Sequence, residues 1–92
     1  MSIEITHVRF SGFKKTHEAI THYKWRSREK SEAGTNDKPS LVAWVDDKGV
    51  AYVGSGSDQV RVGSVHPNGA PAYLRTYADK EWSNNLLSLP TF

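Results

Sequence analysis

The stretch DKPSLVAWVDDKGVAYV, residues 37–53, decides the fold, because it holds a capped helix followed at once by a short apolar strand. Asp37 is a suitable N-cap, and Pro39 lies in the first turn, where a missing N–H costs nothing. Gly49 follows the last helical position and is expected to adopt the left-handed conformation that ends many helices. These signals predict a helix over residues 38–48 and a strand over residues 50–53.

The helix has one apolar stripe. Leu41, Trp44 and Val45 recur at helical spacing, which is typical of a helix that packs against a sheet. Trp25 and Trp44 are therefore expected in the core. Trp82 follows a predicted turn and is expected to anchor the C-terminal leucines.

Two strands are predicted before the helix. Residues 3–10 are rich in β-branched and apolar side chains, and residues 19–26 alternate with period two. The second segment is expected to expose one face that carries Ile20, His22, Lys24 and Arg26. The two strands are expected to pair antiparallel. Residues 27–36 are polar, end in Gly-Thr-Asn, and are expected to form an exposed loop.

Short strands and turns follow the helix. Strands are predicted over residues 59–65 and 73–77, and turns over residues 54–58, 67–71 and 78–81. Asn84 or Asn85 can cap a final turn whose three leucines, Leu86, Leu87 and Leu89, are expected to dock onto the core. The prediction is one α+β domain over residues 1–92: a small, mostly antiparallel sheet of four to five strands, one helix on one face, and a docked leucine-rich turn.

Composition excludes several classes of protein. The chain has 92 residues and a mass of 10.3 kDa, with 37% hydrophobic and 24% charged residues and no cysteine. Disulfides, Cys-ligated zinc and a thiol nucleophile are thereby excluded. No apolar run reaches the roughly 20 residues that span a bilayer, and the first residues do not resemble a signal peptide. A cytoplasmic protein without a membrane partner is expected.

The net charge of +2 is too small to demand a polyanionic partner, but its distribution is uneven. Residues 1–30 carry seven Lys and Arg against three Asp and Glu, whereas residues 31–59 carry two against five. A basic first third can bind phosphate groups. The more ordinary interpretation is a solvated strand face.

The C-terminal third resembles a known family. The residues that carry the resemblance are Tyr73-Leu74-Arg75-Thr76, then Asp79, then Asn84-Asn85-Leu86-Leu87-x-Leu89-Pro90. This pattern resembles the closing signature of small, mainly prokaryotic proteins catalogued as domain of unknown function 3892. The strands at residues 3–8 and 20–25 and the segment Gly49-Val50-Ala51 are similar too. The loop at residues 27–37 and the turn at Gly54 and Gly56 depart from it. The resemblance implies a compact α+β fold and no agreed activity.

No catalytic, metal or cofactor site is predicted. The nearest pair of histidines, His17 and His22, straddles a loop and a strand, and zinc needs three or four converging ligands. There is no Gly-x-Ser-x-Gly elbow, and Asp46 and Asp47 point about 100° apart on a helix. The glycine-serine turn at residues 54–57 lacks the Gly-Lys-Ser ending of a phosphate loop. The sequence favours a non-enzymatic protein.

The most specific candidate site combines aromatic and basic side chains. Tyr73, Arg75 and Tyr77 alternate onto one face of a predicted strand, and Lys24 and Arg26 lie on one face of another. Single-stranded nucleic acid needs aromatic faces for its bases and cations for its phosphates. The alternative is that the two tyrosines cover the rim of the core while Arg75 reaches the tail or Asp79.

The other candidate function is association with a protein. Several short strands leave open sheet edges, and residues 3–10 or 50–53 could pair with a strand of a partner or of a second copy. The sequence does not identify that partner. Binding to nucleic acid should weaken steeply with salt, whereas edge pairing should not.

Overall fold

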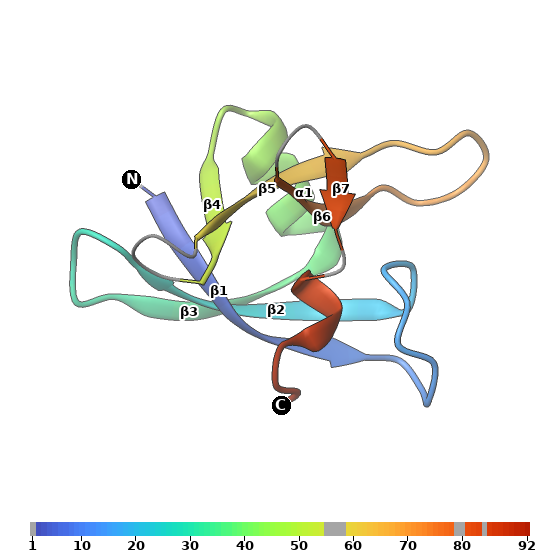
Figure 1. The fold of residues 1–92 in the computed structure, drawn as a ribbon, viewed down its shortest axis with the longest axis horizontal. Helices are drawn as coiled ribbons and strands as arrows, with labels where there is room; N and C mark the ends of the chain where they lie inside the picture. The colour runs from blue at the N-terminus through green and yellow to red at the C-terminus, as the bar shows by residue number, and fades with distance from the viewer. Residues whose placement is uncertain (1, 55–58, 79–80, 84) are drawn as a thin grey trace.

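A computed structural model describes residues 2–54, 59–78, 81–83 and 85–92. Its elements follow the chain in this order (Figure 1): β1 (Ser2–Phe10), β2 (Ile20–Ser27), β3 (Ala33–Asp37), α1 (Lys38–Asp46), β4 (Val50–Val53), β5 (Val60–Val65), β6 (Tyr73–Ala78), β7 (Glu81–Ser83) and the 3₁₀ helix η2 (Asn85–Ser88). The expected α+β class is confirmed.

The strands form one mixed sheet in the order β3-β2-β1-β4-β5-β6-β7. The neighbours β1 and β4 are parallel, and the other adjacent pairs are antiparallel. Parallel neighbours need a long crossover, and α1 supplies it by carrying the chain from the outer strand β3 back to the side of β1. Figure 1 shows β1, β2 and β3 in the lower half of the view and β5, β6 and β7 in the upper half.

The expected number of strands is wrong, since the described residues contain seven strands instead of four to five. The sequence AGTND of β3 lies inside the stretch expected to be a loop, and β7 begins at the last residue of an expected turn. An outer strand needs little apolar alternation, which is why β3 was missed. Its Gly34 is required by packing, because a Cβ there would lie 2.8 Å from the Trp25 indole.

The start of α1 matches the prediction, and its end does not. The Asp37 carboxylate accepts a hydrogen bond of 2.9 Å from the backbone N–H of Ser40, as expected of an N-cap. The left-handed residue is Lys48, with φ of 71°, and not Gly49. The N–H of Gly49 donates to the Trp44 carbonyl at 2.9 Å, and that of Lys48 donates to the Val45 carbonyl at 3.2 Å. This is a Schellman ending shifted one residue earlier than expected.

Gly49 is nevertheless required, for a steric reason. A Cβ at this position would lie 2.4 Å from the indole of Trp44 and 2.6 Å from its carbonyl oxygen. The glycine therefore lets the chain pass directly beneath Trp44 as it enters β4.

The core lies between the sheet and α1, and the sheet curls around it. The side chain of Tyr23 is fully buried, and its hydroxyl accepts a hydrogen bond of 3.4 Å from the Leu74 N–H on β6. Burial raises the pKa of this hydroxyl. The fully or nearly fully buried hydrophobic residues are Ile3, Ile5, Val8, Ile20, Tyr23, Leu41, Val42, Ala51, Val53, Val62, Leu74 and Leu86.

The expected exposure of Ile20 is wrong, because only 1% of this residue is exposed. The register passes from Arg9 opposite His22 to Phe10 opposite Ile20, so Thr21 is an extra residue in β2. A bulge of this kind breaks the alternation of side chains and turns Ile20 toward the core. The expected antiparallel pairing of these two strands is confirmed.

The leucine-rich C-terminal turn docks as expected. Leu86 is fully buried, and Leu87 and Leu89 pack half-buried against the core. The backbone N–H of Val8 donates to the Pro90 carbonyl at 3.0 Å, and Thr91 forms a parallel bridge with Val8. The tail therefore covers the edge of β1 beyond the short strand β4. The expected roles of Trp82, Asn84, Asp79 and the Asn85 side chain lie outside what the structure describes.

Within the described part of the chain, no helix is long and apolar enough to cross a membrane.

Candidate nucleic-acid interface

The five candidate residues come from two strands that are not neighbours. Lys24 and Arg26 belong to β2, whereas Tyr73, Arg75 and Tyr77 belong to β6. Strands β1, β4 and β5 lie between β2 and β6 in the sheet. Whatever joins these residues into one surface must therefore come from the three strands between them.

The strand register supplies a continuous row of side chains across the sheet. Residues directly opposite one another on paired strands point to the same face. Starting from β2, the residues opposite one another on β2, β1, β4, β5 and β6 are Arg26, Glu4, Tyr52, Arg61 and Tyr77. We call this set the arginine–tyrosine row. Its two ends are candidate residues that the sequence had identified.

The row lies on the face of the sheet that α1 does not cover. Successive residues of a strand point to opposite faces. Ile3 and Ala51, which precede Glu4 and Tyr52, are buried in the core, and Val62, which follows Arg61, is buried there too.

Arginine side chains lie close to the aromatic rings of this row. The guanidinium of Arg28 lies 4.4 Å from the centre of the Tyr52 ring, and that of Arg61 lies 5.8 Å from it. Arg26 pairs with Glu4 at 2.8 Å, but its side chain remains 60% exposed. Tyr77 is 40% exposed. Glu29, which accepts hydrogen bonds from Ser2, lies near Arg28, so three arginines stand against two glutamates and the described groups of this surface carry a small net positive charge.

Lys24 lies in a second cluster, around the ring of Phe92. Its amino group is 5.9 Å from the ring centre, and the Arg9 guanidinium is 4.6 Å from it. Arg9 also donates a hydrogen bond of 2.9 Å to the main-chain oxygen of Phe92. His7, which is opposite Lys24 in the register, meets the ring edge-on at 6.4 Å. The tail thus contacts cations of β1 and β2.

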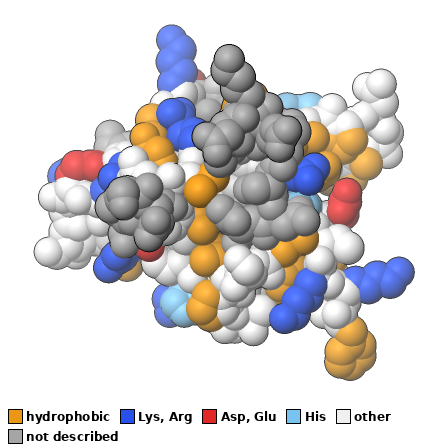
Figure 2. All heavy atoms as spheres, in the orientation of Figure 1, with side chains coloured by type: hydrophobic (Ala, Val, Ile, Leu, Met, Phe, Trp, Pro, Cys, Tyr) orange, Lys and Arg blue, Asp and Glu red, His pale blue; other side chains and the backbone are white. Residues whose placement is uncertain are grey.

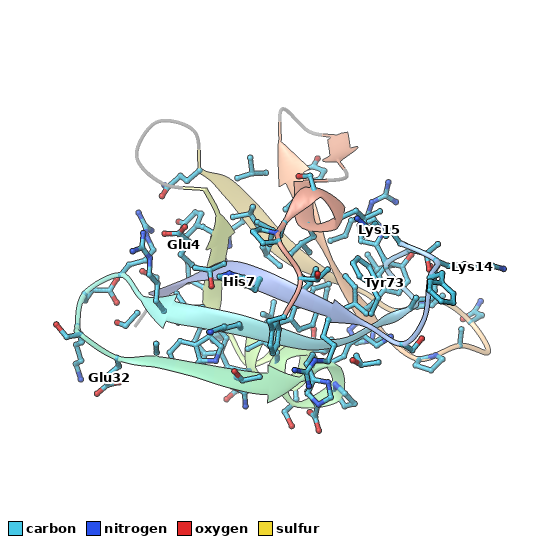
Figure 3. All side chains as sticks on the ribbon, turned by 90° about the horizontal axis from the view of Figure 1, so that it is seen from below. Glu4, His7, Lys14, Lys15, Glu32 and Tyr73 are labelled. Carbon is cyan, nitrogen blue, oxygen red and sulfur yellow. The ribbon has the colours of Figure 1, made fainter. Side chains whose placement is uncertain are left out.

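Tyr73 lies at the end of the sheet near the 11–19 connection. Its ring stacks on His17 with 5.7 Å between the ring centres. Figure 3 shows Tyr73 close to the connection that carries Lys14 and Lys15, and away from Glu4. This contact agrees with the interpretation that Tyr73 covers the rim of the core.

His17 itself is an unusual buried group. Only 7% of it is exposed, and its Nε2 has no hydrogen-bond partner in the described part of the chain. Burial, followed by the nearby charge of Arg75, lowers its pKa, and Glu18 opposes this shift. Burial therefore favours the neutral form of His17 over the charged form.

Sequence reasoning missed Tyr52, Arg61 and Arg28. Tyr52 lies between Ala51 and Val53, and Arg61 lies between Val60 and Val62. That alternation indicates that each points away from the core. Which strands are neighbours depends on the β3–α1–β4 crossover, so the sequence alone did not bring Tyr52 and Arg61 together.

Figure 2 shows described Lys and Arg side chains spread over one face of the molecule, with hydrophobic side chains between them. Among the described residues, no group of three or more His, Asp and Glu could hold a metal ion.

Asp46 accepts a hydrogen bond from the Ser64 hydroxyl and pairs with His66 at 3.0 Å. These contacts lower the pKa of Asp46 and tie α1 to β5 and the residue that follows it.

The two expected sheet edges are wrong. Both β1 and β4 are flanked by strands on each side, and the outer strands are β3 and β7. The error has the same source as the miscounted strands, because β3 covers β2 and the crossover inserts β4 between β1 and β5. Edge pairing with a partner would therefore have to use β3 or β7.

These features define the class: a small α+β domain with one curled mixed sheet, a single crossover helix in its described part, and a C-terminal turn that completes the core. The chain belongs to the family described as "Protein of unknown function (DUF3892)", which it matches over residues 4–90. The resemblance found in the C-terminal third is thereby confirmed. No curated protein and no solved structure matches the chain.

Proposed function

We propose that this protein is a small non-enzymatic binding domain of the cytoplasm that holds single-stranded nucleic acid along the arginine–tyrosine row. One observation carries the proposal: the guanidinium groups of Arg28 and Arg61, which are distant in sequence, both lie within 6 Å of the Tyr52 ring centre, and exposed Tyr77 lies in the same row. Aromatic faces stack bases at about 1–3 kcal/mol each, and cations beside them contact phosphates. No catalytic group or cofactor enters this proposal.

The spacing of the row suits an extended strand. Tyr52 and Tyr77 are separated by β5, so they lie roughly 10 Å apart along a flat sheet. Arg61 lies between them in the register, where a phosphate would pass between two stacked bases. Duplex DNA hides its base faces, and for this reason the row favours a single strand.

The proposal keeps the remaining candidate residues as flanking contacts. Lys24 stands beside Phe92 next to Arg26 on β2, and Arg75 and Tyr73 continue the Tyr77 side of β6. A strand longer than the row itself would reach one or the other group. Replacing Lys24 or Arg75 by Ala should therefore weaken binding of long oligonucleotides more than that of short ones.

The test is a titration of labelled mixed-sequence single strands and duplexes at low and physiological salt, read by amide NMR shifts. Three arginines that each neutralise one phosphate give a slope of log K against log salt of about −2 for a single strand. Arg61→Ala should reduce this slope by about 0.7, and Tyr77→Ala should weaken binding without changing it. Lys14→Ala removes an exposed cation near Tyr73 and is the control for short oligonucleotides, which the row alone can hold.

Absence of shifts at both salt concentrations would contradict the proposal. The alternative is then association with a protein through the outer strand β3, whose backbone edge is left open among the described residues. Such pairing depends little on salt, so the same titration series separates the two functions.

A further inference from the structure

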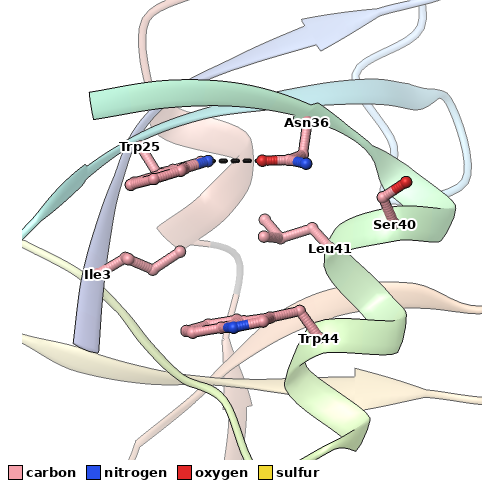
Figure 4. Close-up of a pocket in the computed structure, with 6 residues that line it drawn as sticks. All are labelled: Ile3, Trp25, Asn36, Ser40, Leu41 and Trp44. Carbon is pink, nitrogen blue, oxygen red and sulfur yellow. Dashed lines mark hydrogen bonds between the residues drawn. The ribbon is translucent and has the colours of Figure 1, made fainter. Parts of the chain in front are cut away.

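A pocket of about 230 Å³ opens between α1 and the β3 end of the sheet (Figure 4). It is lined by Ile3, Trp25, Asn36, Ser40, Leu41 and Trp44. Ile3 and Leu41 are buried, Trp25, Asn36 and Trp44 are half-buried, and Ser40 is exposed. The two tryptophans expected in the core thus pack against it and also form the walls of a pocket with an accessible rim.

Each indole is supported from behind by a glycine. A Cβ at Gly34 would lie 2.8 Å from the ring of Trp25, and one at Gly49 would lie 2.4 Å from the ring of Trp44. Neither ring can retreat from the pocket without colliding with backbone. Two aromatic walls held in fixed positions favour a flat ligand, since ordering them costs no further conformational entropy on binding.

One polar group at the rim of the pocket, the Asn36 amide, can bond to a ligand. The Trp25 indole N–H donates to Asn36 Oδ1 at 2.8 Å, so the amide oxygen faces Trp25 and the amide NH₂ faces away. This NH₂ has no partner among the described residues. Figure 4 shows the Asn36 amide at the rim of the pocket, whereas the hydroxyl of exposed Ser40 points away from the two indoles.

We propose that the Trp25–Trp44 pocket binds one neutral, planar heterocycle that presents a ring carbonyl to the amide NH₂ of Asn36, as a pyrimidine such as uracil does. The described lining residues carry no charge, which disfavours an ionic ligand. A cavity of about 150 Å³ holds benzene, and drug-sized ligands need about 300 Å³ or more. A volume of about 230 Å³ therefore suits a single substituted ring.

This inference goes beyond the proposed function and does not depend on it. Trp25 and Ile3 line the pocket, whereas their neighbours Arg26 and Glu4 belong to the arginine–tyrosine row on the opposite face. A free heterocycle has no phosphate, so its binding should be insensitive to salt and to Arg61→Ala. Failure of one proposal leaves the other standing.

The test is an NMR titration of the full chain with uracil and with benzene, following the Trp25 indole N–H. Uracil should give a saturable shift with a dissociation constant of roughly 1 mM or below. Benzene should bind about tenfold more weakly than uracil, because it has no carbonyl to accept a hydrogen bond from Asn36.

Two variants probe the walls and the rim separately. Gly34→Ala pushes the Trp25 ring into the pocket and should abolish binding without changing a lining residue. Asn36→Asp keeps the acceptor for the Trp25 indole N–H and loses the NH₂ donor, so it should weaken the binding of uracil about tenfold. Asn68→Asp, at an exposed position in the 66–72 turn, is the matched control. Thermal melts establish that each variant is folded.

Two results would overturn the inference. One is the absence of a saturable Trp25 shift with uracil in the wild-type chain. The other is equal binding of uracil and benzene that Asn36→Asp leaves unchanged, which would show an apolar cavity without a heterocycle site.

Discussion

Removing the side chain of Leu86 is the sharpest test of the fold. This leucine comes from the last turn of the chain and is fully buried in the core that β1, β2, β4, β5, β6 and α1 form. Leu86→Ala leaves the backbone bonds of the tail in place and removes only the buried side chain. We expect the variant to fold and to be much less stable.

The magnitude follows from the burial. A fully buried Leu→Ala substitution costs about 2–5 kcal/mol, and we take ~3 kcal/mol here. For a domain of this size, 1 kcal/mol shifts the melting temperature by about 5 °C, so the expected loss is ~15 °C. Deleting residues 86–92 also removes half-buried Leu87 and Leu89 and the Val8–Pro90 hydrogen bond, each worth about 1 kcal/mol. That total of ~6 kcal/mol is close to the whole stability of a small domain, about 5–14 kcal/mol, and the truncated chain should be largely unfolded.

The assay is thermal and urea unfolding followed by circular dichroism, with amide NMR dispersion for the truncated chain. Thr91→Ala is the control, because this residue bonds through its backbone and its side chain is exposed. It should change stability by no more than about 0.5 kcal/mol. A Leu86→Ala loss as small as that of the control would refute the docking argument, as would a truncated chain with native dispersion.

Three further results are expected. Lys48→Gly should stabilise the protein by about 1 kcal/mol in urea unfolding, because a residue with a Cβ is strained at φ of 71°. Gly49→Ala should destabilise the protein, because the new methyl group meets Trp44. Asp37→Ala should cost about 1 kcal/mol through loss of the N-cap, measured in the same way. Burial lowers the His17 pKa below its ordinary value of 6.5, so its contribution to stability is complete above that pH and is lost as pH falls. His17→Gln should flatten the fall in melting temperature between about pH 7 and 5, and an unchanged profile would refute this assignment.

The sequence predicted those elements whose signals are local. The cap at Asp37, the stripe that contains Leu41, and the three clustered leucines of the tail each depend on a few adjacent residues. The same kind of local signal predicted the left-handed residue at Gly49, since glycine is the usual residue after the last turn of a helix. The structure shifts it to Lys48, because the packing of Trp44 fixes Gly49 for another purpose.

Elements with weak local signals were missed. The strand β3 contains Ala33 and Gly34 in place of bulky β-branched residues, and only its pairing with β2 makes it a strand. The burial of Ile20 depends on a one-residue bulge, which moves a side chain to the other face without any mark in the hydrophobic pattern. Tertiary pairing overrides propensity at both places.

The candidate site also contains residues that local sequence signals could predict and residues that they could not. Arg26 and Tyr77 could be chosen from alternation within their own strands, but Tyr52 and Arg61 become their partners only through the crossover that places β4 beside β1. The pocket likewise joins Trp25 to Trp44 across elements that are adjacent only because α1 turns back beneath the sheet. Both sites therefore depend on the β3–α1–β4 crossover, and a change that unfolds α1 would remove the pocket and separate the row at the same time. Substitutions that leave α1 intact, such as Arg61→Ala and Asn36→Asp, can separate the two sites, because each acts on a different face of the sheet.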